Sequence, residues 1–376
     1  MLIRHHPLPC DAPGTQRQLQ SLHFEPTGPA SDAPPKVYIQ ASLHADEVPA
    51  MLVAHHLRER LAAAEAEGRL AAEITLVPMA NPIGLSQRLL HGAQGRFDLA
   101  SGENFNRHFA DLGAVAVAAA MAADLAHDPL PPLRRALRQA ADALPAPTEL
   151  QALRRTLLGL AIDADIVLDL HCDNEAVLHL YSPQARWDDA EPLARLLGAE
   201  LALLAARSGG DPFDEACSSP WQAAADAWAQ RGGAPVRWPG LAVTVELRGE
   251  ADVADALARH DADALMRFLA HCGCLVGDDA ALPPLKRAPR PLAGSIPVLA
   301  PTGGVLVFRS EVGDQLAAGD TIAELVCPLR GLVTPVTSPV DGLLYARDHR
   351  RYVPAGARIA KVAGTEARRH GALLSA

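Results

Sequence analysis

Cysteine is scarce in this sequence. Six of the 376 residues are cysteines, at positions 10, 172, 217, 272, 274 and 327, and no two form a Cys-x-x-Cys pair. So few cysteines in a chain of this size argue against the disulfide framework of a small secreted domain. Cys272 and Cys274 stand beside His271 with one intervening residue, which is poor spacing for zinc ligands. The cysteines are therefore expected to be reduced, and most of them buried.

Long apolar runs are also lacking. No stretch reaches the roughly 18 consecutive apolar residues that a membrane-spanning helix needs. The first six residues, MLIRHH, do not supply the apolar core of a signal peptide. The sequence therefore predicts neither membrane insertion nor secretion, and the cytoplasm is the expected compartment.

Clusters of basic residues are missing as well. The formal net charge is −10, and the lysines and arginines are scattered along the chain. A surface that binds nucleic acid normally carries its basic residues together. The charge pattern argues against nucleic-acid partners. The oligomeric state stays open, a homo-oligomer included.

The residues that are present favour a large folded core. Hydrophobic residues make up 49% of the sequence, enough for one large domain and a smaller one. Over residues 1–277, strand-type and helix-type patterns alternate, which predicts an α/β sheet with helices on both faces. The expected strands cover residues 36–43, 73–78, 165–171 and 241–246, and the expected helices cover 47–67, 189–207 and 250–271.

One stretch of the first domain departs from this alternation. Residues 112–160 are rich in alanine and leucine and are punctuated by five prolines. The pattern predicts two or three helices inserted between strands of the sheet. We expect this insertion to pack on the domain or to shape the entrance of its site.

A second domain of a different kind is expected near the C-terminus. Proline-rich residues 278–291 read as a linker, residues 292–364 as short strands separated by glycine and proline, and residues 365–376 as a loose tail. The segment 300–306 is echoed by 338–344, and this repeat resembles the biotinyl/lipoyl carrier fold. Carriers present a modified lysine between the halves, whereas residues 327–331 read CPLRG. The domain is therefore expected to be architectural.

Polar residues with metal-binding chemistry follow three of the expected strands. His44 and Glu47 come after the first strand, His171 ends the strand at 165–171, and Glu246 ends the strand at 241–246. Parallel neighbouring strands would bring these positions to one edge of the sheet, where open α/β sheets bind ligands. Two histidines and a glutamate form a zinc site that leaves a position open for water. Metal-assisted hydrolysis is the chemistry that this set predicts.

The order of motifs resembles one family. The sequence carries HxxE at 44–47, Asn-Pro at 81–82, NFNR at 104–107, LDLH at 168–171 and TVELR at 244–248. Together they resemble the zinc carboxypeptidase-like superfamily, most closely its succinylglutamate desuccinylase/aspartoacylase branch, over residues 36–275. The resemblance implies a mixed sheet flanked by helices and one zinc ion per chain. His44, Glu47 and His171 match the zinc ligands.

The resemblance also implies roles for other residues. Glu246 matches the general base and acid that takes a proton from the attacking water and returns it to the leaving amine. Asn106 and Arg107 match the pair that binds the substrate carboxylate. Arg96 lies where the family places the arginine that stabilises the developing oxyanion, with Arg88 as the competing candidate.

These implications predict a zinc-dependent hydrolase that cleaves the amide bond of a small carboxylate-bearing substrate, with an N-acyl amino acid as the best class. The first alternative keeps the chemistry but acts as a carboxypeptidase on short peptides. The second is a non-catalytic binding protein that retains the fold. The presence of all three ligands and of Glu246 argues against the second alternative.

Overall fold

A computed structural model describes residues 1–10, 12–28, 33–277 and 281–374. Residues 278–280 of the predicted linker and 375–376 of the predicted tail lie outside the described residues, as do positions 11 and 29–32 of the predicted first domain. No helix in the described ranges combines the length and the apolar character needed to cross a membrane.

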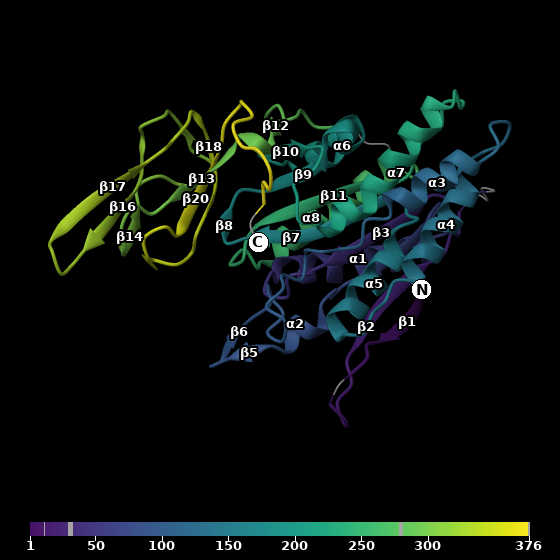
Figure 1. The fold of residues 1–376 in the computed structure, drawn as a ribbon, viewed down its shortest axis with the longest axis horizontal. Helices are drawn as coiled ribbons and strands as arrows, with labels where there is room; N and C mark the ends of the chain where they lie inside the picture. The colour runs from purple at the N-terminus through teal and green to yellow at the C-terminus, as the bar shows by residue number, and fades with distance from the viewer. Residues whose placement is uncertain (11, 29–32, 278–280, 375–376) are drawn as a thin grey trace.

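The larger part of the chain is built on one mixed sheet of nine strands (Figure 1). Strand order is β1-β2-β4-β3-β7-β11-β9-β10-β12. The central strands β4, β3, β7 and β11 are parallel neighbours, whereas β9 runs antiparallel to β11. The strands are β1 (Leu2–Pro7), β2 (Gln18–Phe24), β3 (Lys36–Ala41), β4 (Glu73–Val77), β7 (Ile166–Asp173), β9 (His179–Pro183), β10 (Leu201–Ala205), β11 (Leu241–Gly249) and β12 (Arg290–Pro291). The predicted α/β sheet with parallel neighbours at the site is confirmed.

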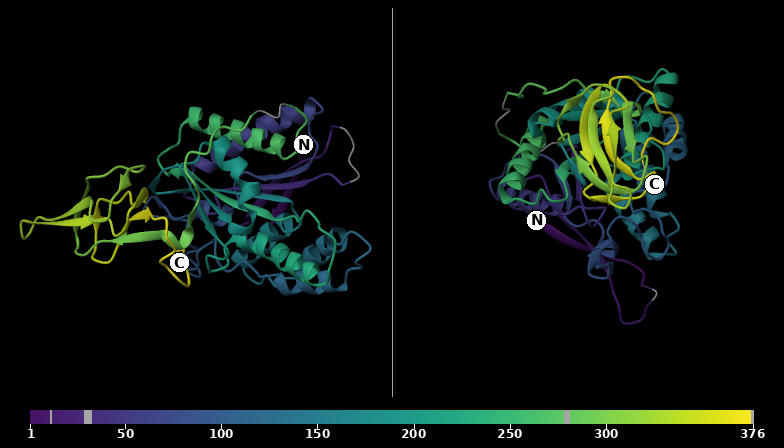
Figure 2. Two further views of the ribbon diagram at one scale, coloured as in Figure 1. Left: turned by 90° about the horizontal axis from the view of Figure 1, so that it is seen from above. Right: turned by 90° about the vertical axis from the view of Figure 1, so that its left-hand side faces the viewer.

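Helices cover both faces of this sheet (Figure 2). On one face lie α1 (Pro49–Ala66), α6 (Trp187–Leu197) and α8 (Asp255–His271). On the other lie α3 (Gly113–Ala122), α4 (Leu130–Asp142), α5 (Glu149–Ala161) and α7 (Phe213–Gln230). Each face has its own hydrophobic core, because strands buried on both sides leave apolar side chains pointing each way. Burial of one large core side chain such as Phe268 contributes about 1.5–3 kcal/mol.

The prediction for residues 189–207 is wrong in its second half. The helix ends at Leu197, because Gly198 adopts a left-handed conformation (φ 66°) that terminates it. The chain then forms β10, which pairs in parallel with β9 and β12. An apolar run of five residues inside a buried sheet resembles a helix segment in sequence, so the pattern did not separate the two.

The alanine- and leucine-rich stretch forms three helices, α3 to α5. The two prolines of α4 stand in its first turn, where their missing N–H groups cost no hydrogen bond. A capping box at Thr148 and Gln151 begins α5. The remaining short elements near the site are α2 (Pro82–Ser86), β5 (Arg88–Leu89), β6 (Gly92–Ala93), β8 (Glu175–Ala176), η1 (Gln184–Arg186) and η2 (Leu292–Gly294).

The C-terminal β region (residues 292–364) contains two small sheets around a separate core. One sheet has the order β13-β20-β18-β15 and the other β17-β16-β14-β19. The strands are β13 (Ser295–Leu299), β14 (Gly304–Phe308), β15 (Gln315–Leu316), β16 (Thr321–Cys327), β17 (Leu332–Thr337), β18 (Gly342–Arg347), β19 (Tyr352–Val353) and β20 (Arg358–Ala363). An all-β region at this end of the chain was predicted from its glycine and proline spacing.

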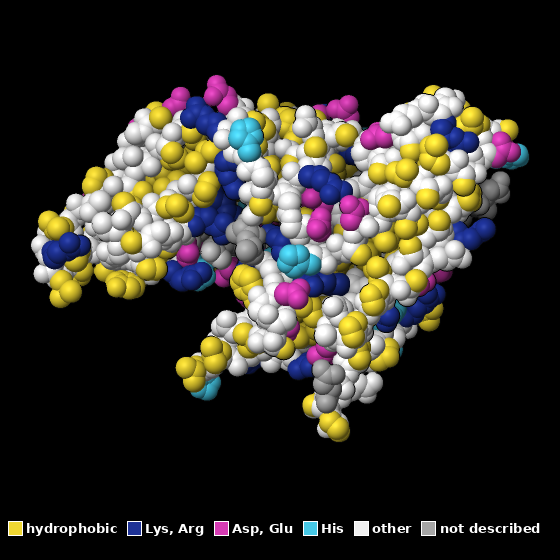
Figure 3. Space-filling model, viewed as in Figure 1, with side chains coloured by type: hydrophobic (Ala, Val, Ile, Leu, Met, Phe, Trp, Pro, Cys, Tyr) yellow, Lys and Arg dark blue, Asp and Glu magenta, His cyan; other side chains and the backbone are white. Residues whose placement is uncertain are grey.

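The β region is joined to the rest by backbone pairing. Strand β8 of the larger part pairs antiparallel with β18 of the β region, and β12 extends the nine-stranded sheet beside β10. Residues 365–374, named here the C-terminal segment, then run back to the junction (Figures 1 and 2). The prediction of a loose tail is wrong for this segment, because its backbone is hydrogen-bonded to both parts. A hollow lined by lysine and arginine side chains separates the two parts on the surface (Figure 3).

Candidate active site

The turn between β3 and α1 places His44 and Glu47. Ser42, with φ 58°, takes a left-handed conformation that few residues with side chains adopt. Its N–H donates to the carbonyl of Leu170 on β7 (3.1 Å), and its hydroxyl donates to the carbonyl of Glu47 (2.7 Å). The turn is thereby fixed against the neighbouring strand, and His44 and Glu47 are each only 3% exposed.

Gly95 lets a second loop approach this turn. A Cβ atom at Gly95 would lie 2.1 Å from the backbone nitrogen of Asp46, a distance that no side chain can occupy. The carbonyl of Gly95 accepts a hydrogen bond from the N–H of Ala45 (2.9 Å). Because glycine permits this close approach to the turn, the next residue, Arg96, lies within hydrogen-bond distance of the Glu47 carboxylate.

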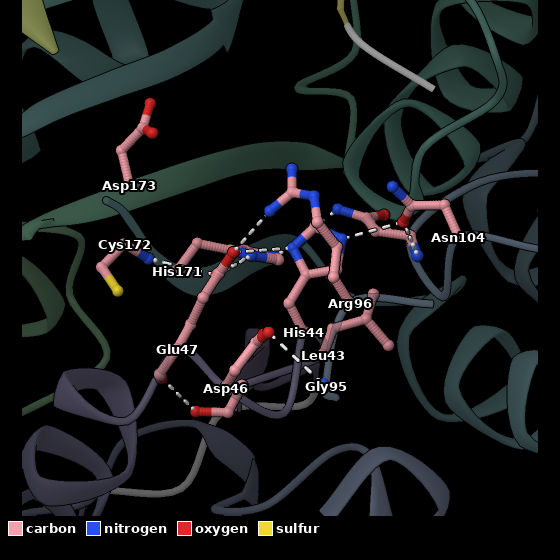
Figure 4. A network of polar contacts seen from close by, with 12 residues as sticks. Leu43, His44, Asp46, Glu47, Gly95, Arg96, Asn104, His171, Cys172 and Asp173 are labelled. Carbon is pink, nitrogen blue, oxygen red and sulfur yellow. Dashed lines mark hydrogen bonds and ion pairs between the residues drawn. The ribbon is translucent and has the colours of Figure 1, made fainter. Parts of the chain in front are cut away.

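Three donor side chains converge at the carboxyl edge of the central strands (Figure 4). His44 Nδ1 lies 2.8 Å from Glu47 Oε1, and His171 Nδ1 lies 2.6 Å from Glu47 Oε2. One ligand atom from each residue lies within 4.8 Å of the others. The three residues predicted as metal ligands are therefore brought together, and together they could hold a metal ion.

The rear nitrogen of each imidazole is held by an acceptor. Asn104 Oδ1 accepts the N–H of Asn106 (2.8 Å), so this atom is the amide oxygen, and His44 Nε2–H donates to it at 2.9 Å. Nε2 of His171 lies 3.0 Å from Asp169 Oδ2. With Nε2 protonated in both rings, each Nδ1 presents a lone pair toward Glu47.

This arrangement fits a divalent metal ion. Two imidazole lone pairs and a carboxylate face one another, and all three are hydrogen-bond acceptors. Only a bound cation or added protons would relieve their mutual repulsion. Nitrogen and oxygen donors in a set of two histidines and one glutamate suit zinc.

A chain of buried polar groups supports His171 from behind. Asp169 is fully buried, and its Oδ1 accepts a hydrogen bond from Gln40 Nε2 (2.9 Å). Gln40 Oε1 in turn accepts from the hydroxyl of Tyr38 (2.9 Å). Sequence reasoning assigned no role to Gln40 or Asn104. A glutamine inside the otherwise apolar strand β3 was the available signal.

Glu246 lies beside the donor cluster on β11. It stands opposite His171 in the parallel register of β11 and β7, so both side chains lie on the same side of the sheet. Its Oε2 is buried, and among the described residues it has no hydrogen-bond partner. Burial, followed by repulsion from Glu47, raises the pKa of Glu246 to about 8. A carboxylate with a free oxygen and a raised pKa is suited to exchange a proton at neutral pH.

The two candidate arginines for the oxyanion differ in position. Arg96 Nη1 lies 3.1 Å from Glu47 Oε1, and its side chain lines the cavity described below. Arg88 is exposed on the β5–β6 hairpin and does not line that cavity. The geometry favours Arg96, and nothing in it supports substrate binding by Arg88.

Asn106 and Arg107 lie on the same cavity wall. Asn106 Oδ1 accepts the backbone N–H of Phe213 at the start of α7 (2.8 Å), and its Nδ2 lies 3.5 Å from His171 Nε2. Arg107 is 7% exposed, and its Nη1 donates to the carbonyl of Asn106 (2.6 Å). Burial and the nearby Arg96 lower the pKa of Arg107, but arginine keeps its charge. Two guanidinium groups therefore stand close to the donor cluster.

A cavity of about 490 Å³ lies at this edge of the sheet. Its lining includes the donor cluster, Glu246, Arg96 and Arg107 from the larger part. The opposite wall comes from the β region and the C-terminal segment, with Tyr345, Lys361 and Leu373 among its residues. A volume of this size suits a small organic ligand. Sequence reasoning could not identify the opposite wall, because it comes from the β region and the C-terminal segment, which no local pattern places beside the sheet edge.

The junction behind Glu246 contains a half-buried ion pair and a buried histidine. Asp173 on β7 is paired with Lys361 on β20, and this lysine keeps the pKa of Asp173 below its ordinary value although burial opposes the charge. His179 lies nearby, fully buried, with ring centroids of Tyr181 and Tyr345 at 5.4 and 5.0 Å. His179 Nδ1–H donates to the carbonyl of Val177 (2.8 Å).

His179 predicts a pH-dependent loss of stability. Burial lowers its pKa to about 4 in the folded protein, against about 6.5 in the unfolded chain. As pH falls through this window the unfolded state binds the proton first, so the free energy of unfolding decreases by about 3 kcal/mol from this group alone. Urea unfolding between pH 8 and 4 is expected to show this loss, and the His179→Gln variant a correspondingly shallower slope. Equal slopes for both proteins would contradict the assignment.

The fold and the site define a mixed α/β protein with a candidate divalent-metal centre at the carboxyl edge of its sheet. Residues 33–127 match the family model described as the succinylglutamate desuccinylase/aspartoacylase catalytic domain. This span contains His44, Glu47, Arg96, Asn106 and Arg107. Among curated proteins, none matches the chain.

Solved structures extend the similarity to nearly the whole chain. A succinylglutamate desuccinylase/aspartoacylase family protein from Shewanella amazonensis has 28% sequence identity and a TM-score of 0.84, covering 96% of this chain and 98% of its own. Another from Shewanella frigidimarina has 25% identity and a TM-score of 0.85, covering 96% of each chain. An ectoine utilization protein from Ruegeria pomeroyi shares the fold at 18% identity and a TM-score of 0.64, covering 96% of this chain and 94% of its own.

Residues 33–127 therefore match the catalytic domain of the succinylglutamate desuccinylase/aspartoacylase family, the family that the order of motifs resembles, and two solved structures of family proteins are similar to nearly the whole chain. Proteins of this family are generally hydrolytic.

Proposed function

We propose that this protein is a zinc-dependent deacylase that hydrolyses the amide bond of an N-acyl amino acid or a similar small carboxylate-bearing substrate. One observation supports it above the others: the His44, Glu47 and His171 donors share a cavity with a carboxylate, Glu246, whose buried Oε2 has no partner among the described residues. The match of residues 33–127 to the family's catalytic domain supports the class of reaction.

Zinc held by His44, Glu47 and His171 would polarise the substrate carbonyl and make water acidic enough to supply hydroxide at neutral pH. The protein's own residues would do the rest. Glu246 would accept the proton of the attacking water at Oε2 and later donate it to the leaving amine. Asp169 and Asn104 hold the imidazole rings so that Nδ1 faces the cluster.

In this proposal each of the two arginines interacts with a different negative charge of the substrate. Arg96, next to Glu47, would stabilise the negative charge that develops on the carbonyl oxygen. Arg107, held by the carbonyl of Asn106, would bind the substrate carboxylate, because its planar guanidinium can donate two parallel hydrogen bonds. The β region would act as the architectural wall of the cavity, and its likeness to carrier domains stays a prediction.

The test combines elemental analysis with release of free amine from N-acyl amino acids and dipeptides. We expect about one zinc ion per chain, turnover of acyl amino acids, loss of turnover on chelation and recovery when zinc is added back. Turnover restricted to dipeptides would favour the carboxypeptidase alternative. A protein with neither metal nor turnover, even after zinc is supplied, would be a binding protein that retains the fold.

A further inference from the structure

The C-terminal segment is fixed to both sides of the cavity. The backbone N–H of Arg369 donates to the carbonyl of Ala293 (2.9 Å), and its guanidinium donates to the carbonyl of Ser295 (3.1 Å), both on the side of the β region. Leu373 N–H donates to the carbonyl of Ser208 (2.7 Å) in the loop before α7. The segment therefore bridges the two parts of the molecule.

The segment also packs closely against the loop before α7. A Cβ atom on Gly209 would approach the Cα of Ala372 to 3.2 Å, which leaves no room between the two backbones. Gly209 itself has φ 88°, a conformation that favours glycine. This contact holds Leu373 and Leu374 on the cavity wall, where both are partly buried.

The two leucines complete a continuous apolar wall. They belong to one hydrophobic cluster with Leu203 of β10 and Leu292 of η2. Two tyrosines extend the same cluster. All six side chains line the cavity: Leu203, Leu292, Leu373, Leu374, Tyr181 and Tyr345. The wall therefore combines residues from β10, the β region and the C-terminal segment.

The wall reaches the candidate catalytic carboxylate. Tyr181 pairs with Thr244 in the register of β9 and β11, two residues before Glu246 on the same strand. Glu246 is also close enough to Tyr181 to help raise the pKa of its hydroxyl, after the larger effect of burial. A group attached near the scissile amide would therefore meet apolar carbon on this side of the cavity.

Most cations on the β-region side already have acidic partners. Arg347 is paired with Glu175 and Glu311, and Lys361 is paired with Asp173. Lysine and arginine side chains gather along the hollow in Figure 3, and cations at this edge attract an anionic substrate toward the cavity. These pairs do not call for a second substrate carboxylate at the apolar wall.

We propose that the substrate carries, besides its carboxylate, an apolar group of several carbons that sits on this wall, and that the C-terminal segment determines specificity for it. The proposal rests on the proposed deacylase function and adds the class of its substrate. The cavity of about 490 Å³ has room for such a group beside the reacting amide. The apolar group could belong to the acyl chain or to the amino acid, since the wall recognises the same chemistry in either.

Matched substrates distinguish the two sources. N-hexanoylglycine against N-acetylglycine tests the acyl chain, and N-acetylleucine against N-acetylglycine tests the amino acid. N-succinylglycine tests an acidic acyl group of moderate length. We expect kcat/KM to be roughly 10-fold or more higher for at least one apolar substrate than for N-acetylglycine, since each buried methylene favours binding by several-fold, and higher than for N-succinylglycine.

Variants of the full chain test the segment itself. The double variant Leu373→Ala with Leu374→Ala is expected to reduce the preference for the apolar substrate by roughly 10-fold, mainly through KM, because the lost carbon contacts act on binding. Leu332→Ala is the matched control, since this leucine of β17 is 52% exposed and does not line the cavity. It should keep the preference. Thermal melts of the variants verify folding.

Two results would overturn the inference while leaving the deacylase proposal intact. One is turnover of N-acetylglycine together with a preference for N-succinylglycine over both apolar substrates. The other is an unchanged apolar preference in a folded double variant. Absence of turnover on every acyl amino acid, with zinc bound, would instead refute the proposed function on which the inference rests.

Discussion

Replacing Glu246 by glutamine is expected to lower kcat by roughly 100-fold or more, the usual scale of general acid–base catalysis. Glutamine keeps the shape of the side chain but cannot take a proton from water or return one to an amine. The buried Oε2, without a partner among the described residues, is the atom on which this expectation rests. KM should change much less, because the effect falls on the reaction step.

Metal content separates this effect from damage to the site. Glu246 is not one of the three donors, so the Glu246→Gln protein should retain its zinc. Glu250→Gln is the matched control: this glutamate follows four residues later, its carboxylate accepts from Asn174 Nδ2 (2.7 Å), and it does not line the cavity. The control should keep most of its activity. A fully active Glu246→Gln enzyme would refute the assignment of the base.

Replacing His171 by alanine is expected to remove both metal and turnover. His171 supplies one of three donors, and two remaining donors hold zinc poorly because tetrahedral sites need three protein ligands and a water. The change also leaves the carboxylate of Asp169 fully buried without its imidazole partner. Breaking a buried charged pair costs about 3–5 kcal/mol, so the melting temperature should fall as well.

Elemental analysis of the dialysed protein and steady-state kinetics check the His171→Ala prediction. Zinc content should fall from about one ion per chain toward none, with no recovery of turnover in excess zinc. His127→Ala is the control, because this side chain is 78% exposed and forms its ion pair with Asp124, far from the donor cluster in the sequence. If His171→Ala bound zinc as well as the unchanged protein, the ligand assignment would have to be abandoned.

The donor cluster could be predicted because each donor follows an apolar strand. His44, Glu47 and His171 stand near the carboxyl ends of β3 and β7, and parallel neighbouring strands necessarily bring those ends together. Periodicity located the central strands β3, β4, β7 and β11 for a similar reason, but it missed β1, β2, β9 and the helix α7. It failed at residues 201–205, because a short apolar run has no period that separates a buried strand from a helix.

Other parts of the site depend on contacts that no local pattern records. The approach of Arg96 requires Gly95 to touch the turn at Asp46, and glycine is common in loops whether or not another segment lies against it. The position of Arg88 on an exposed hairpin is likewise invisible in sequence. Lys361, Tyr345 and the C-terminal segment reach the cavity only because β8 pairs with β18.

That pairing of β8 with β18 governs how molecules enter and leave. The ladder and the half-buried pair of Asp173 with Lys361 join the two parts on the side of the cavity behind Glu246. An outward movement of the β region would break the backbone hydrogen bonds of this ladder and separate Asp173 from Lys361. These contacts therefore oppose an opening of the cavity by movement of the β region. Substrate and product are therefore expected to pass through the opening already present, and the width of that opening would limit which molecules can be exchanged.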